Sequence, residues 1–209
     1  MRKSRAGIRD EASGRRSAVN HSPAWRGVLA AGLLVVLAGC ADTRYAAHHA
    51  RDAGALDATQ DVAVVPLENL TNYPKAGLIA AELVSTELYR RGLFRLTEGT
   101  ALRQALNALE IDVADLAVTY AAAELGRRLE VDAVLVGSVS EYGYQHGLHE
   151  EPVVGLNLRL VDAASGDILW AASHSTTGRG YLARDSVNAA AQRLVEEMVA
   201  TLGSHLRTP

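Results

Sequence analysis

The chain has few of the residues that carry covalent and metal chemistry. Its 209 residues include one cysteine, which excludes an intrachain disulfide. The sequence holds no P-loop, no G-x-G-x-x-G and no G-x-S-x-G element. Aromatic residues make up only 5% of the chain, so aliphatic side chains must fill most of the core. These absences predict a protein that is not an enzyme, with no catalytic residues and no cofactor.

Long apolar runs are also missing. The longest, from Gly27 to Cys40, holds about twelve apolar residues, whereas a helix that crosses a bilayer needs ~20. Positive charge is scarce after this run. Seven of the 21 Lys and Arg and two of the 24 Asp and Glu precede Cys40, so the remainder carries a net charge of −8. An acidic body lacks the cations that neutralise phosphates, and nucleic acid is therefore excluded as a partner.

The N-terminal segment has the pattern of an export signal. A basic stretch is followed by the short apolar run and then by small residues, which predicts a signal peptide over residues 1–39. Its last residues, Leu37-Ala38-Gly39-Cys40, resemble the lipobox of bacterial lipoproteins. The resemblance implies that Cys40 is lipidated and becomes the new N-terminus. A membrane-anchored signal with an incidental cysteine is the alternative.

The residues after the cysteine bear on localisation. By resemblance to lipoprotein sorting, Ala41 rather than aspartate favours the periplasmic side of the outer membrane over the inner membrane. Small and polar residues then continue to about position 60, which predicts a lipidated tether over residues 40–60. We expect His48 and His49 to be solvated on this tether. The membrane, reached through the lipid, is thus one expected partner.

A globular domain is predicted over residues 61–205, since hydrophobic residues are 48% and charged residues 22% of the chain. Expected strands and helices alternate at first, and three consecutive strands, a β-meander, follow before a last helix. The fold class is α/β (α+β), a mixed sheet in the order β-α-β-α-α-β-β-β-α with packed helices. The expected strands are residues 62–67, 93–97, 131–142, 152–162 and 168–175, and the expected helices are 76–91, 101–109, 119–129 and 186–202.

Two loops are candidate sites for a partner. Asn69, Thr71, Asn72 and Tyr73 follow the first expected strand, and loops at strand ends often carry ligands. The alternative is a capped polar loop without a ligand. The second loop spans Gly143–Glu151 and holds two histidines.

The two histidines of the second loop are His146 and His149. The order H-x-x-H-E-E differs from the helical H-E-x-x-H of zinc proteases, and glycines and Pro152 oppose a helix. A solvated hairpin loop is the main interpretation, ahead of a partner contact and of a metal. We therefore predict weak partner-binding positions and no metal site.

The strand and helix segments together resemble the CsgG superfamily of bacterial lipoproteins, whose members include LpoB-like periplasmic domains and which is related to the TolB N-terminal domain. The resemblance rests on LGRRLEVDAVLVGSV at 125–139 and LNLRLVDAASGDILW at 156–170. Gly137 is expected to allow close packing within its strand. Pore-forming members add two amphipathic hairpins per subunit, and residues 143–151 and 176–184 are too short and polar for them.

The function that follows is an accessory or scaffold role in an envelope assembly, exerted by protein–protein contact. An LpoB-like activator of a peptidoglycan synthase, a penicillin-binding protein, is the alternative. A CsgG-like secretion-channel subunit is a third hypothesis. The expected protein partner is an unidentified envelope protein, either a penicillin-binding protein or a second copy of the chain.

Overall fold

The computed structural model describes residues 44–50, 56, 60–97, 99–108, 110–146, 150–178 and 185–206. All of them lie in the second of the chain's two units, Asp42–Pro209. The predicted signal peptide and Cys40 lie outside the described residues. Within the described residues no helix is long and apolar enough to cross a membrane.

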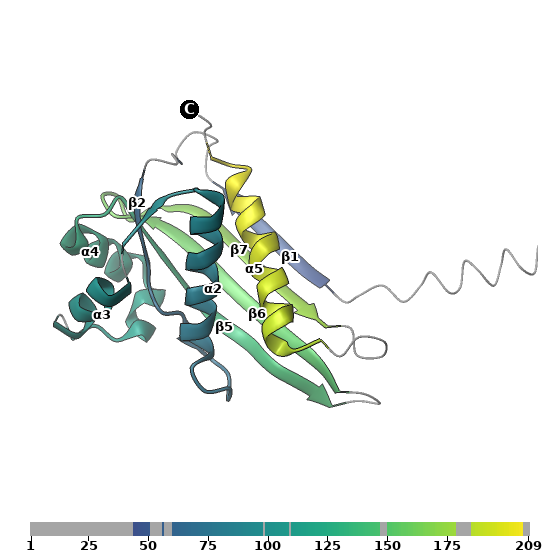
Figure 1. The fold of residues 1–209 in the computed structure, drawn as a ribbon. Coiled ribbons are helices and arrows are strands. Elements are labelled where there is room, and N and C mark those ends of the chain that lie inside the picture. The colour runs from purple at the N-terminus through teal and green to yellow at the C-terminus, as the bar shows by residue number, and fades with distance from the viewer. Residues whose placement is uncertain are drawn as a thin grey trace, which may run out of the picture. The chain divides into compact units, whose positions relative to one another are not determined.

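One mixed sheet organises the described residues (Figure 1). Its strands lie in the order β1-β7-β6-β5-β2-β4, and the short β3 pairs with β5 beyond β2. The strands are β1 (Arg44–Ala50), β2 (Asp61–Val64), β3 (Glu68–Asn69), β4 (Arg95–Leu96), β5 (Ala133–His146), β6 (Glu150–Asp162) and β7 (Ile168–Thr177). The helices are α2 (Ala76–Arg91), α3 (Gly99–Ala108), α4 (Thr119–Leu129) and α5 (Val187–Gly203), with a 3₁₀ helix η1 (Val113–Ala117).

The predicted fold class and element order are confirmed, with β1 and β3 as additions. Strands β5, β6 and β7 form the predicted antiparallel meander, and β2 lies parallel to both β4 and β5. The turn between β6 and β7 is capped by Asp162, whose side chain accepts hydrogen bonds from the amides of Ala164 (3.1 Å) and Ser165 (2.7 Å). Gly166 follows with φ 79°, a conformation that favours glycine.

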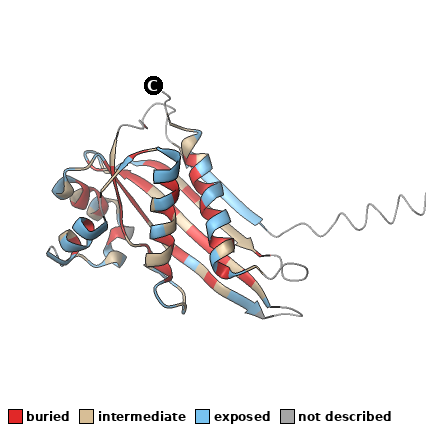
Figure 2. Cartoon of the chain, viewed as in Figure 1, coloured by how far each residue is buried: buried red, intermediate tan, exposed pale blue. Residues whose placement is uncertain are grey.

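Helices cover both faces of the sheet (Figure 2). Helices α2 and α5 lie over the main core on one face, and α3, η1 and α4 lie over a smaller core on the other. The main core includes Val84, Leu88, Leu156, Leu158, Leu160, Trp170, Leu194 and Met198. The smaller core includes Ala63, Val65, Leu102, Leu106, Leu116, Leu125, Val134, Val136 and Val161. Aliphatic residues dominate both cores, as the composition predicts.

Gly137 lies where β5 and β6 approach closely. A Cβ at this position would stand 2.0 Å from the backbone oxygen of Asn157, far inside van der Waals contact. The prediction that Gly137 serves close packing is confirmed.

The predicted tether is wrong for residues 44–50. These residues form β1, which pairs antiparallel with β7 from Arg44 opposite Thr176 to Ala50 opposite Trp170. Leu56, also in the expected tether, is buried in the main core. Arg44 donates to a carboxylate oxygen of Glu197 on α5 at 3.1 Å and so ties the strand to the helix. The strand escaped prediction because alanine and histidine have little strand preference.

The loop predicted at Gly143–Glu151 is shorter than expected. β5 continues to His146 and β6 begins at Glu150, with His146 opposite Glu150 in the register. Only residues 147–149, which the structure does not describe, separate the two strands. Glycine and histidine at positions 143–146 do not predict a strand from the sequence. Pairing with β6 makes this segment a strand.

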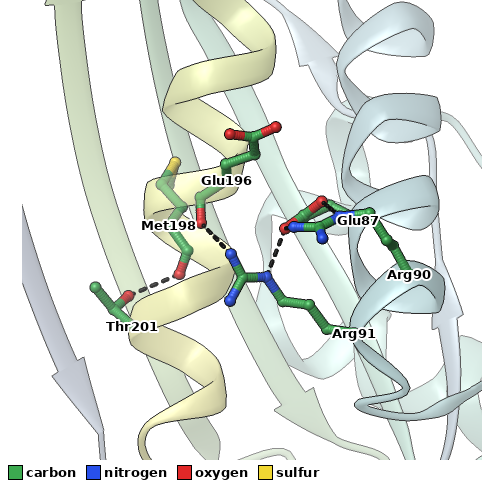
Figure 3. A network of polar contacts seen from close by, with 6 residues as sticks. All are labelled: Glu87, Arg90, Arg91, Glu196, Met198 and Thr201. Atoms are coloured by element: carbon green, nitrogen blue, oxygen red, sulfur yellow. Dashed lines mark hydrogen bonds and ion pairs between the residues drawn. The ribbon is translucent and has the colours of Figure 1, made fainter.

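Glu87 is a charged residue of the helix α2, yet its side chain is buried between α2 and α5 (Figure 3). Arg90 donates from Nε and Nη2 at 2.6 Å to the two carboxylate oxygens, and Arg91 donates from Nε to one of them. Arg91 also donates to the backbone oxygen of Glu196 on α5, at 3.3 Å. These arginines hold the pKa of Glu87 down at about 2, against the cost of burial.

Candidate functional site at the hairpin end of the sheet

The loop after β3 is fixed by its own side chains. Asn69 Oδ1 accepts from the amide of Thr71 at 3.1 Å and from its hydroxyl at 2.8 Å. Asn69 Nδ2 donates to the backbone oxygen of Tyr73 at 2.9 Å, and the Tyr73 amide donates to the Thr71 hydroxyl at 3.1 Å. These bonds make a rigid, capped loop. It presents Leu70, 60% exposed, and Asn72, also exposed, to the outside.

Tyrosines join this loop to β5 and α5. The ring of Tyr73 lies against that of Tyr142, with centroids 4.9 Å apart. The Tyr142 hydroxyl donates to Asn188 Oδ1 at 2.6 Å, and burial raises the pKa of this phenol, with Tyr73 adding to the rise. The hydroxyl of Tyr144 accepts from the amide of Val187 at 3.4 Å. A depression of about 430 Å³ lies here, lined by residues 71–74, 140–144 and Val153.

We call this region the hairpin end: the 69–75 loop, the start of β1 at Arg44 and Tyr45, β5 from Glu141 to His146, β6 from Glu150 to Val154, and residues 185–188 at the start of α5. The structure brings four predicted residues together there, namely Asn69, Thr71, Asn72 and Tyr73. His146 ends β5 at the same end, while its side chain and all of His149 lie outside the described residues.

Sequence reasoning missed Leu70, Tyr142, Tyr144 and Asn188 as parts of this surface. The signal that could have found the two tyrosines is their i, i+2 spacing, which places both on one face of a strand.

A second depression, of about 420 Å³, lies on the sheet face opposite α5, over β1, β7, β6 and β5. Asn157 lies at the base of this depression. Its Oδ1 accepts from the Ser173 hydroxyl at 2.6 Å, and its Nδ2 donates to the Ser138 hydroxyl at 3.3 Å. This row is a cross-strand polar ladder that satisfies its own hydrogen bonds. It offers neither an acid–base pair nor an activated nucleophile.

Histidines gather where β1 meets α5. His174 on β7 is 4% exposed, and neither ring nitrogen has a hydrogen-bond partner among the described residues. Burial lowers its pKa, Glu197 opposes that shift and His48 adds to it. His48 lies near His205, with ring centroids 6.1 Å apart. In the described part of the chain, no three His, Cys, Asp or Glu residues are placed to hold a metal ion.

Comparison with known proteins gives relatives by structure only. No protein-family model matches the sequence, and a search of curated proteins finds no match. The structure of the PelC dodecamer from Paraburkholderia phytofirmans is similar, with a TM-score of 0.58 and 25% sequence identity. The similarity covers 79% of this chain and 100% of that one.

Two further structures have related folds. Lipoprotein GNA1162 from Neisseria meningitidis matches with a TM-score of 0.54 and 23% identity, over 69% of this chain and 99% of that one. The LpoB C-terminal domain from Salmonella enterica is more distant, with a TM-score of 0.45 and 22% identity over 59% of this chain and 86% of that one. The chain thus has a fold that a bacterial lipoprotein also has.

Proposed function

We propose that this protein is a lipid-anchored, non-catalytic component of an envelope assembly, held through Cys40 at the periplasmic side of the outer membrane and acting by contact with other proteins. Copies of the same chain are the first of those partners. The observation that carries the proposal is the match to PelC, which assembles as a dodecamer, over the whole of that chain. The lipobox at residues 37–40 supports the anchor, and the fold of GNA1162, a lipoprotein, agrees with it.

The described sites agree with a protein that binds rather than reacts. The hairpin end and the polar ladder use their hydrogen-bonding groups internally. The perturbed carboxyl of Glu87 is enclosed by two arginines and serves the α2–α5 contact. Membership of the CsgG superfamily remains part of this proposal, and it rests on the residues of the meander quoted above.

The test begins with the full chain expressed in a bacterium that lipidates proteins. We expect intact mass to show a lipid on Cys40, and membrane fractionation to place the protein in the outer membrane. The Cys40→Ser variant should lose both. Retention of lipid and membrane binding by that variant would contradict the anchor.

Assembly is measured on the lipidated protein in detergent by mass photometry and light scattering. We expect a multimer of the chain. A monomer at every concentration would exclude self-association. If this chain stimulated the glycan polymerisation that a purified penicillin-binding protein carries out, the activator role would replace the proposal. Turnover of an envelope substrate would contradict the non-enzyme assignment.

A further inference from the structure

The pairing of β1 with β7 limits the distance between the domain and the lipid on Cys40. Three residues separate Cys40 from Arg44, the first residue of β1. An extended chain spans at most ~3.6 Å per residue, so four steps reach about 14 Å. A free tether up to position 60 would instead reach ~70 Å. Pairing of β1 with β7 therefore shortens the maximal distance between the lipid on Cys40 and the domain from ~70 Å to about 14 Å.

The hairpin end is the part of the domain that this short connection brings to the membrane. Arg44 pairs with Thr176, Thr176 with Val154, and Val154 with Tyr142, so one row across four strands runs from β1 to the hairpin end. Beyond the row, β5 continues for four residues to His146, which at ~3.3 Å per residue is about 13 Å. The hairpin thus projects about as far as the anchor can reach. In Figure 1 the loop before α2, the end of β5 and the start of β6 lie at the bottom of the domain, and the start of β1 lies above them beside α5.

Three of the exposed large apolar side chains of the described residues lie at this end, while Val118 and Tyr120 are exposed at the start of α4 and Ile168 at the start of β7. Tyr45 is 60%, Leu70 60% and Tyr144 45% exposed. Tyrosine combines an apolar ring with a polar hydroxyl, and this suits it to the boundary between lipid and water. Tyr89, 80% exposed, lies at the other end of the domain, near the C-terminus of α2.

The described residues of the hairpin end form no basic patch for anionic headgroups. The cations Arg44 and Lys75 are accompanied by Glu141, Glu150, Glu151 and Asp185. Arg44 also pairs with Glu197 at 3.1 Å, and Asp185 with Arg193 at 2.7 Å. Anionic lipids attract polybasic segments, so the described residues here would contact a membrane through apolar and aromatic side chains.

We propose that the hairpin end rests in the headgroup region of the membrane that holds the lipid, with Tyr45, Leu70 and Tyr144 as its contacts. This inference rests on the proposed lipidation of Cys40. It assigns a lipid surface, rather than a protein, to the exposed side chains of this end.

The experiment uses the lipidated full chain in phosphatidylcholine vesicles. The chain has no cysteine besides Cys40, whose thiol is consumed by the lipid, so single-cysteine variants can be labelled selectively. Leu70→Cys and Tyr144→Cys receive an environment-sensitive fluorophore, and Tyr89→Cys is the matched control at the opposite end. Quenching by lipids with a nitroxide headgroup is then measured for each.

We expect labels at 70 and 144 to be quenched severalfold more than the label at 89, equally with and without anionic lipid. Quenching no stronger than at 89 would overturn the proposal, as would a strong signal only when a second protein is added. Leu70→Cys carries the test alone if Tyr144→Cys unfolds. Intact mass reports the lipid on Cys40 separately. An unlipidated chain contradicts the proposed function, whereas a lipidated chain whose label at 70 stays in water contradicts this inference alone.

Discussion

Replacing Glu87 with glutamine tests the buried ion pairs between α2 and α5. The carboxyl has a pKa of about 2 in the folded protein against an ordinary 4.5, a difference that corresponds to ~3 kcal/mol at neutral pH. Arg90 is 59% exposed, so water screens part of this energy. We therefore expect Glu87→Gln to lower the free energy of unfolding by about 2 kcal/mol at pH 7.

The pH dependence has a definite sign. Because the folded pKa is depressed, the stabilisation is present above pH 4.5 and is lost as the pH falls toward 2. Urea unfolding of residues 41–209 between pH 2 and 7 measures this. The difference between wild type and Glu87→Gln should shrink through that window.

A matched control is available on α4. Glu124 pairs with Arg127 and Arg128 at the same i+3 and i+4 spacings, and its side chain is 40% exposed. Glu124→Gln should cost much less than Glu87→Gln. Equal losses for the two variants, or a Glu87→Gln difference that is constant from pH 7 to 2, would refute the argument that burial gives the Glu87 pairs their strength.

Three further outcomes follow. Tyr142→Phe removes the hydroxyl bond to α5 and should cost about 1 kcal/mol in urea unfolding. Gly137→Ala places a methyl group 2.0 Å from the backbone oxygen of Asn157 and should lower the free energy of unfolding by about 3 kcal/mol or more. Gly143→Ala, with open space around the added methyl group, should change that free energy little. Equal effects of the two substitutions would contradict the close approach of β5 and β6 at Gly137. Burial lowers the pKa of His174, so the folded state resists its protonation and the wild type should lose stability below about pH 6.5. His174→Leu should abolish this loss. An unchanged pH profile of stability would show that other groups cause it.

The meander could be predicted from sequence because its strands alternate and its turn has a specific chemistry. Leu156, Leu158 and Leu160 share one face, and Asp162 caps the turn that follows. Local pattern and tertiary structure agree there, so the sequence was sufficient.

Elements that depend on distant partners could not be predicted. β1 has seven residues of alanine, histidine, tyrosine and arginine, and only pairing with β7 makes it a strand. Glu87 has the charge of a surface residue, and the arginines one turn later make its burial tolerable. Of the candidate site, the polar loop residues Asn69, Thr71, Asn72 and Tyr73 were found because loop chemistry is local, whereas Leu70 was missed. Their meeting with Tyr142 and Asn188 depends on how β5 and α5 pack.

The antiparallel pairing of β1 with β7 also has a mechanical consequence. If the lipid on Cys40 holds the protein while a partner pulls on the domain, the load enters at Arg44 and acts along the strand axis. A load in this direction shears all the ladder bonds of β1 together instead of opening them one at a time. The domain should therefore stay close to the membrane under small forces, and only separation of β1 would lengthen the connection, by the residues that precede the buried Leu56. Single-molecule pulling between residue 41 and the C-terminus should then show this extension as a distinct step.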